Sequence, residues 1–327
     1  MILTSKPIAR VIAGLCLTSL AVFPAVPRQR QASTLAHAGA LATQKSQLAT
    51  IPGAPNCPVF PADNVWNEPV NTLPVAKNSR AIIKNIGLGI GLHPDFGSYA
   101  GYGIPYNVVD SSTPMVRVKF YYASESDKGP YPIPAHPRIE YGSDHHLLIV
   151  DKSNCYLYEL FAAKHSRHGW TAGSGAIWNL ESNRLRPASW TSADAAGLPI
   201  LPGLVRYDEV QAGAIDHALR FTVPDTRRAF VYPARHEAGD TNSPNYPPMG
   251  LRLRLKASVS LAGFSAEDRT LLQAMKTYGI IVADNGSPWY ITGAPDPQWN
   301  DSDLHLIDRI TGGDFEVVDT SRLRSGP

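Results

Sequence analysis

The chain has 327 residues, a formal net charge of +2, a charged fraction of 18%, and 28 prolines and 26 glycines. Globular proteins carry about a quarter of charged residues, so this chain is comparatively apolar and interrupted by many turns. Its Lys and Arg residues are scattered, which argues against the basic cluster expected of a nucleic-acid-binding or membrane-surface protein.

The first 38 residues are predicted to be an export signal or an N-terminal anchor. Lys6 and Arg10 precede a largely apolar stretch, 11–26, that is short for a membrane span. Cleavage after Ala25, cleavage after Ala38 and an uncleaved anchor are the alternatives. We therefore expect a secreted or extracytoplasmic protein with no membrane contact beyond this signal. A flexible linker is predicted over 39–56, which is rich in Ala, Gln, Ser and Thr.

Beyond the signal, the chain contains two cysteines, Cys57 and Cys155. In an oxidising compartment such a pair predicts a disulfide, and two separate buried thiols are the alternative. No Cys-x-x-Cys spacing is present, which argues against a metal site. We find no repeat or inner boundary, so a single β-rich domain is expected over 57–322, followed by a tail at 323–327.

The predicted elements are mostly short strands with two clear helices. The helices cover 80–86, ended by Gly87, and 266–278, capped by Ser265. The clearest strands form a hairpin, 147–150 with 155–161, around a polar turn. The other expected elements are strands at 115–122, 229–235, 251–258 and 315–318, an edge segment at 129–137, helical turns within 208–219, a hairpin of 280–282 with 289–291, and a helix at 302–310. This pattern predicts an antiparallel β-sandwich or distorted barrel with a few peripheral helices.

The hairpin carries the first candidate for chemistry. Side chains alternate along a strand, so Glu159 shares a face with Leu157 and Phe161. If that face is buried, the Glu159 carboxyl must be paired or have a raised pKa. A carboxyl group with a raised pKa is what a glycoside hydrolase uses as its acid, and a second carboxylate completes the mechanism. The candidate partners are Asp144, Asp194, Asp208 or Glu209, and Asp284.

A long irregular segment, 169–202, contains three tryptophans that are candidates for binding a sugar. Trp170, Trp178 and Trp190 are expected to wall the opening of the site, together with His146 and His236. The predicted partner is a polysaccharide or cell-wall glycan. The main hypothesis is therefore a carboxylate-dependent, polysaccharide-cleaving enzyme.

Three other functions remain open. A carbohydrate-binding module without activity, or a structural protein of the cell envelope, would contain the same aromatic residues. A divalent metal held by His146, Glu159 and His236 on a β-barrel wall would make a metal-dependent enzyme. An acyl-transfer serine at Ser174 is the weakest alternative, because Gly173-Ser174-Gly175 lacks the spacing and the following helix of a nucleophile elbow.

Several runs of sequence resemble a group of exported bacterial proteins that are labelled hypothetical or by an adjoining discoidin-type (coagulation factor 5/8 C) domain. The runs are GSGAI at 173–177, LRP at 185–187, the stretch 190–200, PGLVRYDE at 202–209 and IVADNGS at 281–287. The resemblance covers about 60–320 and implies one long domain, with a possible glycan setting. It implies no activity and no catalytic residues, and no discoidin domain is recognisable within the chain.

Overall fold

The structure is a computed structural model that describes residues 50–323, and it is mostly β with several sheets and few helices, as the sequence predicts. The predicted signal lies outside the described residues. The predicted linker is wrong at its end, because Thr50–Ile51 (β1) pairs with Ala54–Pro58 (β2), and Ile51 and Ala54 are buried. No helix within 50–323 has the length and apolar character needed to cross a bilayer.

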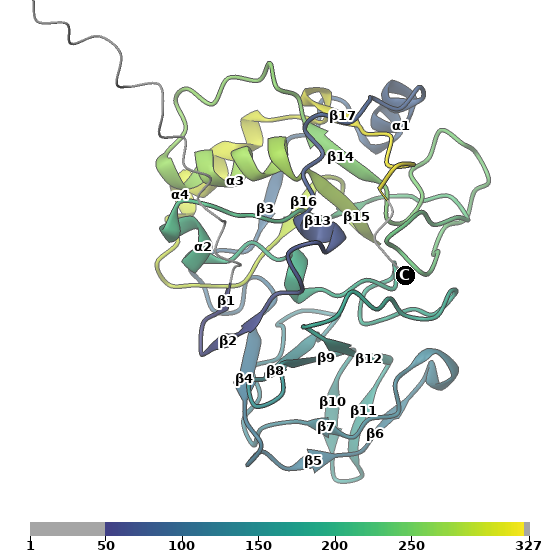
Figure 1. The fold of residues 1–327 in the computed structure, drawn as a ribbon, viewed down its shortest axis with the longest axis vertical. Helices are drawn as coiled ribbons and strands as arrows, with labels where there is room; N and C mark the ends of the chain where they lie inside the picture. The colour runs from purple at the N-terminus through teal and green to yellow at the C-terminus, as the bar shows by residue number, and fades with distance from the viewer. Residues whose placement is uncertain (1–49, 324–327) are drawn as a thin grey trace, which may run out of the picture. The chain divides into compact units, whose positions relative to one another are not determined.

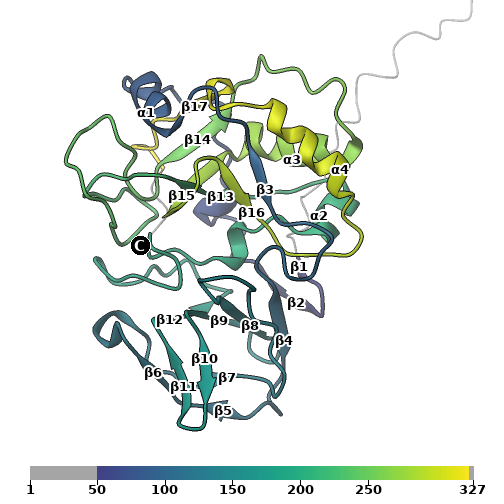
Figure 2. The same ribbon diagram turned by 180° about the vertical axis from the view of Figure 1, so that it is seen from behind.

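The larger sheet has six strands and carries the helices (Figures 1 and 2). Its order is β17 (Phe315–Val317), β14 (Arg252–Leu255), β15 (Ile280–Asn285), β13 (Leu219–Val223), β16 (Tyr290–Thr292) and β3 (His93–Asp95). Helix α1 (Ser79–Ile86) packs on β17, and α3 (Ala266–Thr277) packs on β14. Two short helices, α2 (Tyr207–Ala212) and α4 (Asp301–Leu304), complete the helical part.

Both long predicted helices are confirmed, together with the residues that end or begin them. The backbone N–H of Gly87 donates to the carbonyl of Ile83 at the end of α1. At the start of α3, the hydroxyl of Ser265 accepts a hydrogen bond of 3.0 Å from the N–H of Asp268. The predicted last helix is α4 followed by a 3₁₀ turn, His305–Arg309.

One predicted hairpin and one predicted strand are wrong. Strands β15 and β16 do not form a hairpin, because β13 lies between them, parallel to β15 and antiparallel to β16. Residues 229–235 form no strand beyond one isolated bridge, Phe230 with Met249. Pro233 interrupts this segment and has no N–H to give to a sheet.

The smaller sheet has four strands, and it contains the predicted central hairpin (Figure 2). Its order is β12 (Ser174–Asn179), β9 (Tyr156–Phe161), β8 (Leu147–Asp151) and β4 (Tyr106–Val109). Every residue of β8 is buried, because its two faces contact different hydrophobic clusters. Strands β4 and β8 are parallel, so the sheets are mixed and not purely antiparallel.

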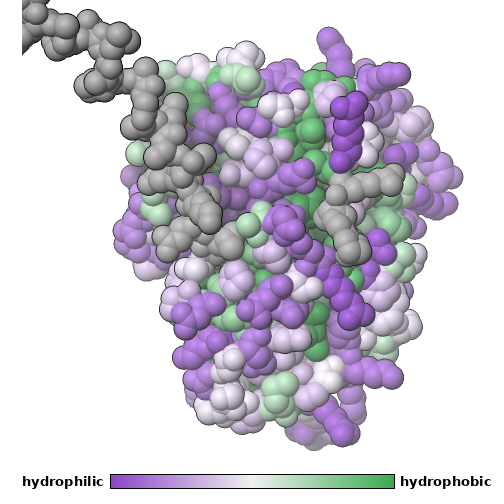
Figure 3. All heavy atoms as spheres, viewed as in Figure 1, coloured by the Kyte–Doolittle hydropathy of each residue, from purple (hydrophilic) through white to green (hydrophobic). Residues whose placement is uncertain are grey.

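The remaining strands form small sheets beside β9 and β12. A three-stranded sheet joins β10 (Lys164–Ser166), β11 (Gly169–Ala172) and β6 (Val118–Phe120), and β5 (Met115–Val116) pairs with β7 (Tyr131–Pro132). Cys57 of β2 and Cys155 form the predicted disulfide, which ties β2 to the start of β9. Polar side chains cover most of the face shown in Figure 3, with apolar groups visible in narrow strips between them.

Candidate functional site

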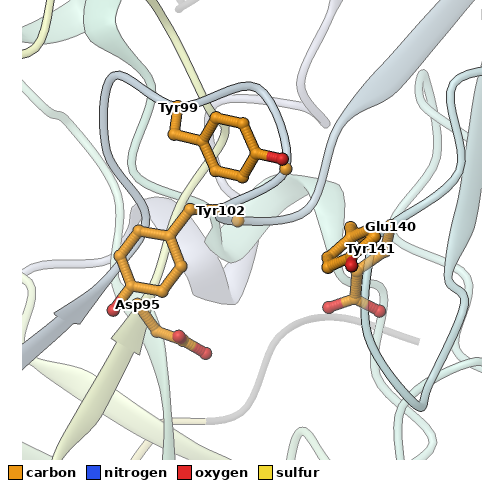
Figure 4. A pocket seen from close by; sticks show the side chains of 7 residues that line it. Asp95, Tyr99, Tyr102, Glu140 and Tyr141 are labelled. Atoms are coloured by element: carbon orange, nitrogen blue, oxygen red, sulfur yellow. The ribbon is translucent and has the colours of Figure 1, made fainter.

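A polar pocket lies between the end of β3 and the loop that precedes β8. Its volume is about 530 Å³. Two acids and three tyrosines contribute its side chains, and glycines supply the rest of its wall: Asp95, Glu140, Tyr99, Tyr102, Tyr141, Gly101 and Gly103. Figure 4 shows Asp95 and Tyr102 across the pocket from Glu140 and Tyr141, with Tyr99 beside the opening between them. The pocket therefore brings together two segments, 95–103 and 140–141, that are separate in the sequence.

Strand β3 holds the first carboxyl group at the edge of the large sheet. Asp95 is the last residue of β3 and lies opposite Thr292 of β16 in parallel register. The tyrosine-bearing loop then turns back at Gly103, where a side chain is excluded because a Cβ would lie 2.7 Å from the carbonyl oxygen of Gly293. The N–H of Ile104 donates to that same oxygen at 3.0 Å. This loop is thus fixed to the sheet on the floor of the pocket.

The environment of Asp95 favours its protonated form. Burial raises the pKa of Asp95 above its ordinary value, and the negative charge of Glu140 raises it further. His93, Arg220 and the hydroxyl of Tyr102 act in the opposite direction. An acid that retains its proton in a pocket is a candidate general acid.

The environment of Glu140 favours its ionised form. Nδ1 of His146 lies 2.6 Å from a carboxylate oxygen of Glu140, and the backbone N–H of His146 donates to the same oxygen at 3.1 Å. Burial acts to raise the pKa of Glu140, but these contacts outweigh it, so the pKa lies below its ordinary value. His146 itself is buried, and its pKa is raised because the carboxylate stabilises the imidazolium against burial. The pKa values of the two acids in the pocket are therefore shifted in opposite directions, upward for Asp95 and downward for Glu140.

A buried ionic cluster lies behind the pocket, centred on Arg220 of β13. The guanidinium of Arg220 lies 2.9 Å from a carboxylate oxygen of Asp194 and 3.0 Å from the hydroxyl of Thr292. Burial raises the pKa of Asp194 to about 7, with Arg220 opposing this shift and Asp284 adding to it. Arg220 also lowers the pKa values of Asp95 and Glu140, so its charge reaches the pocket.

Glu159 lies outside the described pockets. Its carboxylate is fully buried and accepts hydrogen bonds of 2.9–3.0 Å from the backbone N–H groups of Ile200 and Leu201. Burial raises the pKa of Glu159, while those two N–H groups lower it. The structure thus places Glu159 as an anchor for the chain at 200–201, without the access to substrate that the sequence hypothesis needs.

The other acids predicted from the sequence have different surroundings. Asp194 is buried in its ion pair with Arg220, and Asp144 is exposed on the loop before β8. Asp208 lines a separate pocket of about 260 Å³ near Arg206, whose buried guanidinium pairs with Glu209. None of these acids lines the pocket between Asp95 and Glu140, and none shares a described pocket with the buried Glu159.

None of the three predicted tryptophans lines the pocket between Asp95 and Glu140. Trp178 and Trp190 lie against Arg186, whose guanidinium carbon is 5.6 Å and 5.5 Å from the two ring centroids. Trp178 is buried, and Trp170 of β11 packs near the ring of His165. These rings therefore contact protein groups, because a buried guanidinium provides a planar surface for aromatic side chains.

Neither predicted histidine lines the pocket, but the buried His146 contacts Glu140, which does. His236 lies elsewhere, with Nδ1 2.8 Å from the carbonyl oxygen of Ala195. Residues 50–323 contain no group of three or more His, Cys, Asp or Glu side chains that could hold a metal, so the set His146, Glu159 and His236 does not converge.

The sequence prediction missed Asp95, Glu140 and the three tyrosines of the pocket. A signal was present, because His93-Pro94-Asp95 precedes a glycine-rich loop with two tyrosines, and Glu140-Tyr141 repeats the combination of an acid with an aromatic residue. Functional residues are commonly carried by such loops. Comparisons with protein-family models, with curated proteins and with solved structures find no match to this chain.

Proposed function

We propose that this protein cleaves a polysaccharide at the pocket between Asp95 and Glu140, with Asp95 as proton donor and Glu140 as the ionised carboxylate. The observation that supports this proposal most strongly is the placement of two carboxyl groups on opposite sides of one pocket walled by tyrosines. Glycoside hydrolysis uses such a pair. The hypothesis of a glycan-cleaving enzyme is thereby retained, but on residues other than Glu159.

The tyrosines support a carbohydrate as the substrate. Tyr99 and Tyr141 are 67% and 77% exposed, which is unusual for large side chains beside a pocket. Their rings offer flat apolar surfaces to the faces of sugar rings, and their hydroxyls offer hydrogen bonds. Tyr102 is more deeply set, with its hydroxyl 2.7 Å from Nε2 of His93 and 3.0 Å from the carbonyl oxygen of Pro94.

The proposed chemistry uses the opposite pKa shifts of the two acids, raised for Asp95 and lowered for Glu140. The Asp95 carboxylic acid gives its proton to the glycosidic oxygen as the bond from that oxygen to the anomeric carbon breaks. The Glu140 carboxylate stabilises the positive charge that develops on this carbon, or bonds to it. Water then supplies the hydroxyl group to the anomeric carbon, and its released proton returns to Asp95. The imidazolium of His146 keeps Glu140 ionised throughout.

A non-catalytic carbohydrate-binding site is the second candidate. One contact favours it, because the close pairing of Glu140 with His146 reduces the basicity of this carboxylate. In a binding site, Asp95 and Glu140 would accept hydrogen bonds from sugar hydroxyls. The same residues would then determine affinity, and no product would form.

The experiment is a screen of the purified protein on a panel of polysaccharides, with release of reducing ends as the readout. Asp95→Asn and Glu140→Gln are each expected to reduce turnover by 100-fold or more (an order-of-magnitude expectation for acid–base groups) while far-UV circular dichroism is unchanged. Asp225→Asn and Glu181→Gln are matched controls, since both acids are exposed and lie outside the described pockets. Full turnover in both pocket variants would contradict the proposal. Saccharide binding without any turnover by the wild type would favour the binding site.

A further inference from the structure

The exposed tyrosines of the described residues occur at two places. Four are among the exposed large hydrophobic side chains, and Tyr99 and Tyr141 belong to the pocket described above. The other two, Tyr121 and Tyr122, line a second hollow of about 490 Å³. Tyr121 is 83% exposed and Tyr122 is 46% exposed. Two neighbouring aromatic rings left in solvent indicate a surface that another molecule covers.

The backbone holds these two rings in place. The N–H of Tyr121 donates to the carbonyl of Ala172 at 3.0 Å, and the N–H of Tyr122 donates to that of Gly173 at 2.8 Å. The rings meet edge to face, with centroids 4.7 Å apart. Because the segment is tied to the end of β11, the backbone that carries the rings is fixed before any ligand arrives, which reduces the entropy lost on binding.

The floor of the hollow is also aromatic. Phe161, at the end of β9, and Phe120, at the end of β6, both line it. Gly173 permits the close approach of Phe161, because a Cβ at this position would lie 2.6 Å from the phenylalanine ring. The hollow thus offers an apolar base next to exposed tyrosine rings.

The charge of the hollow is entirely positive. Across the three-stranded sheet, Lys164 lies opposite Thr171, and Thr171 lies opposite Lys119, so the three side chains form a row on one face. Both lysines are exposed, both line the hollow, and no acidic side chain lines it. Neither ammonium group has a hydrogen bond or ion pair within residues 50–323. Two unneutralised cations on one face attract an anion.

We propose that this hollow is a binding site for an acidic polysaccharide, with Lys119 and Lys164 contacting carboxylate or sulfate groups and Tyr121 stacking on a sugar ring. The proposal goes beyond the cleavage proposed above, because it involves a different hollow and a different chemical group. The two sites are linked through one contact, since Phe161 packs on His146 with ring centroids 5.7 Å apart, and His146 holds Glu140.

The test measures binding of the full chain to three polymers by affinity electrophoresis: polygalacturonate, dextran sulfate and neutral dextran. The Asp95→Asn variant is used throughout, so that cleavage does not affect the result and a failure of the proposed activity stays separate from a failure of this site. Binding to at least one acidic polymer is expected to be 10-fold or more tighter than binding to dextran. The polymer that binds more tightly identifies the carboxylate or the sulfate as the preferred group.

Variants then separate this site from general charge. Replacing Lys119 and Lys164 together by alanine is expected to weaken acidic-polymer binding at least 10-fold, and Tyr121→Ala is expected to weaken it several-fold. The matched control replaces Lys77, just before α1, and Lys84, within α1, by alanine. This double variant is expected to leave binding unchanged. Equal losses in both double variants, equal binding of neutral dextran, or equal binding of double-stranded DNA would overturn the proposal.

Discussion

Both ring nitrogens of His146 face hydrogen-bond acceptors: Nδ1 lies 2.6 Å from a carboxylate oxygen of Glu140, and Nε2 lies 3.0 Å from the carbonyl oxygen of Ala193. A carbonyl cannot donate, so Nε2 carries a hydrogen, and an ionised carboxylate at Nδ1 requires a second one. The ring is therefore an imidazolium while Glu140 is ionised. This pair fixes the charge at one side of the pocket.

The pair predicts a defined pH window for stability. Glu140 has a lowered pKa, so its contribution is present above its ordinary value of 4.5 and is lost as the pH falls through the folded-state pKa. His146 has a raised pKa, so its contribution is complete below its ordinary value of 6.5 and is lost as the pH rises through the folded-state pKa. The stabilisation is thus greatest between these two values.

His146→Gln is expected to lower the free energy of unfolding by about 3 kcal/mol within that window, because it leaves a partly buried carboxylate without its cation. Chemical denaturation of the variant and the wild type between pH 3 and 9 measures the difference. His136→Gln, at an exposed position, is the control. A difference that does not vary with pH would show that packing alone is lost.

Glu159→Gln is expected to reduce stability and to leave turnover by the folded protein unchanged. The carboxylate accepts hydrogen bonds from Ile200 and Leu201, and a glutamine would bring an N–H₂ group toward those donors. Loss of a buried charged acceptor should lower the free energy of unfolding by about 2–3 kcal/mol. Denaturation curves and turnover per folded molecule are the two measurements. A 100-fold loss of turnover at unchanged stability would restore Glu159 as a catalytic candidate.

Asp284→Asn is expected to make stability less dependent on pH between 4 and 7. Burial raises the pKa of Asp194 from 3.8 to about 7, and Asp284 adds to the shift. A carboxyl group with a raised pKa stabilises the fold below its ordinary pKa, and this contribution is lost as the pH rises toward 7. Removing the neighbouring charge lowers the pKa of Asp194, so the loss becomes smaller. Melting temperatures of the variant and the wild type between pH 4 and 7 test this prediction. A steeper fall of stability with pH in the variant would contradict it.

Removing the disulfide is expected to cause a large loss of stability. Cys57 and Cys155 are 98 positions apart, and closing a loop of this length in the unfolded chain corresponds to about 4.7 kcal/mol in the chain-entropy model. The double variant Cys57→Ala/Cys155→Ala should unfold at lower denaturant than the wild type. A reductant should shift the wild type in the same direction and leave the double variant unaffected.

Local patterns predicted the helices and the central hairpin well. Helix α3 is indicated by its apolar stripe and its Ser265 cap, which are close together in the sequence. The hairpin is indicated by the β-branched and aromatic runs on either side of 151–154, which are also close together. The insertion of β13 between β15 and β16 depends on packing across 60 residues, and nothing local indicates it. The contacts of the arginines on β14 depend on the tertiary fold for the same reason. Arg252 is buried, and its guanidinium donates to the carbonyls of Val65, Glu68 and Tyr278.

The sequence predicted a site based on carboxylates, but it did not identify the two acids that line the pocket. The expectation that Glu159 is buried and either paired or shifted in pKa agrees with its position, but burial removes it from solvent. An apolar strand face therefore indicated a structural carboxylate as readily as a catalytic one. Asp95 and Glu140 face a common pocket only because β3 pairs with β16 and because His146 positions Glu140 from the start of β8. Such pairings are decided by the tertiary fold.

The pairing of β3 with β16 also determines when the pocket can exist. His93 and Tyr290 lie side by side in the sheet although roughly 200 positions separate them, a contact of very high sequence separation. During synthesis on the ribosome, Asp95 is made well before its partner strand and cannot be aligned until residues 290–292 have been added. A shortened product that ends between residues 141 and 289 would retain both acids of the pocket and still lack the strand that aligns Asp95.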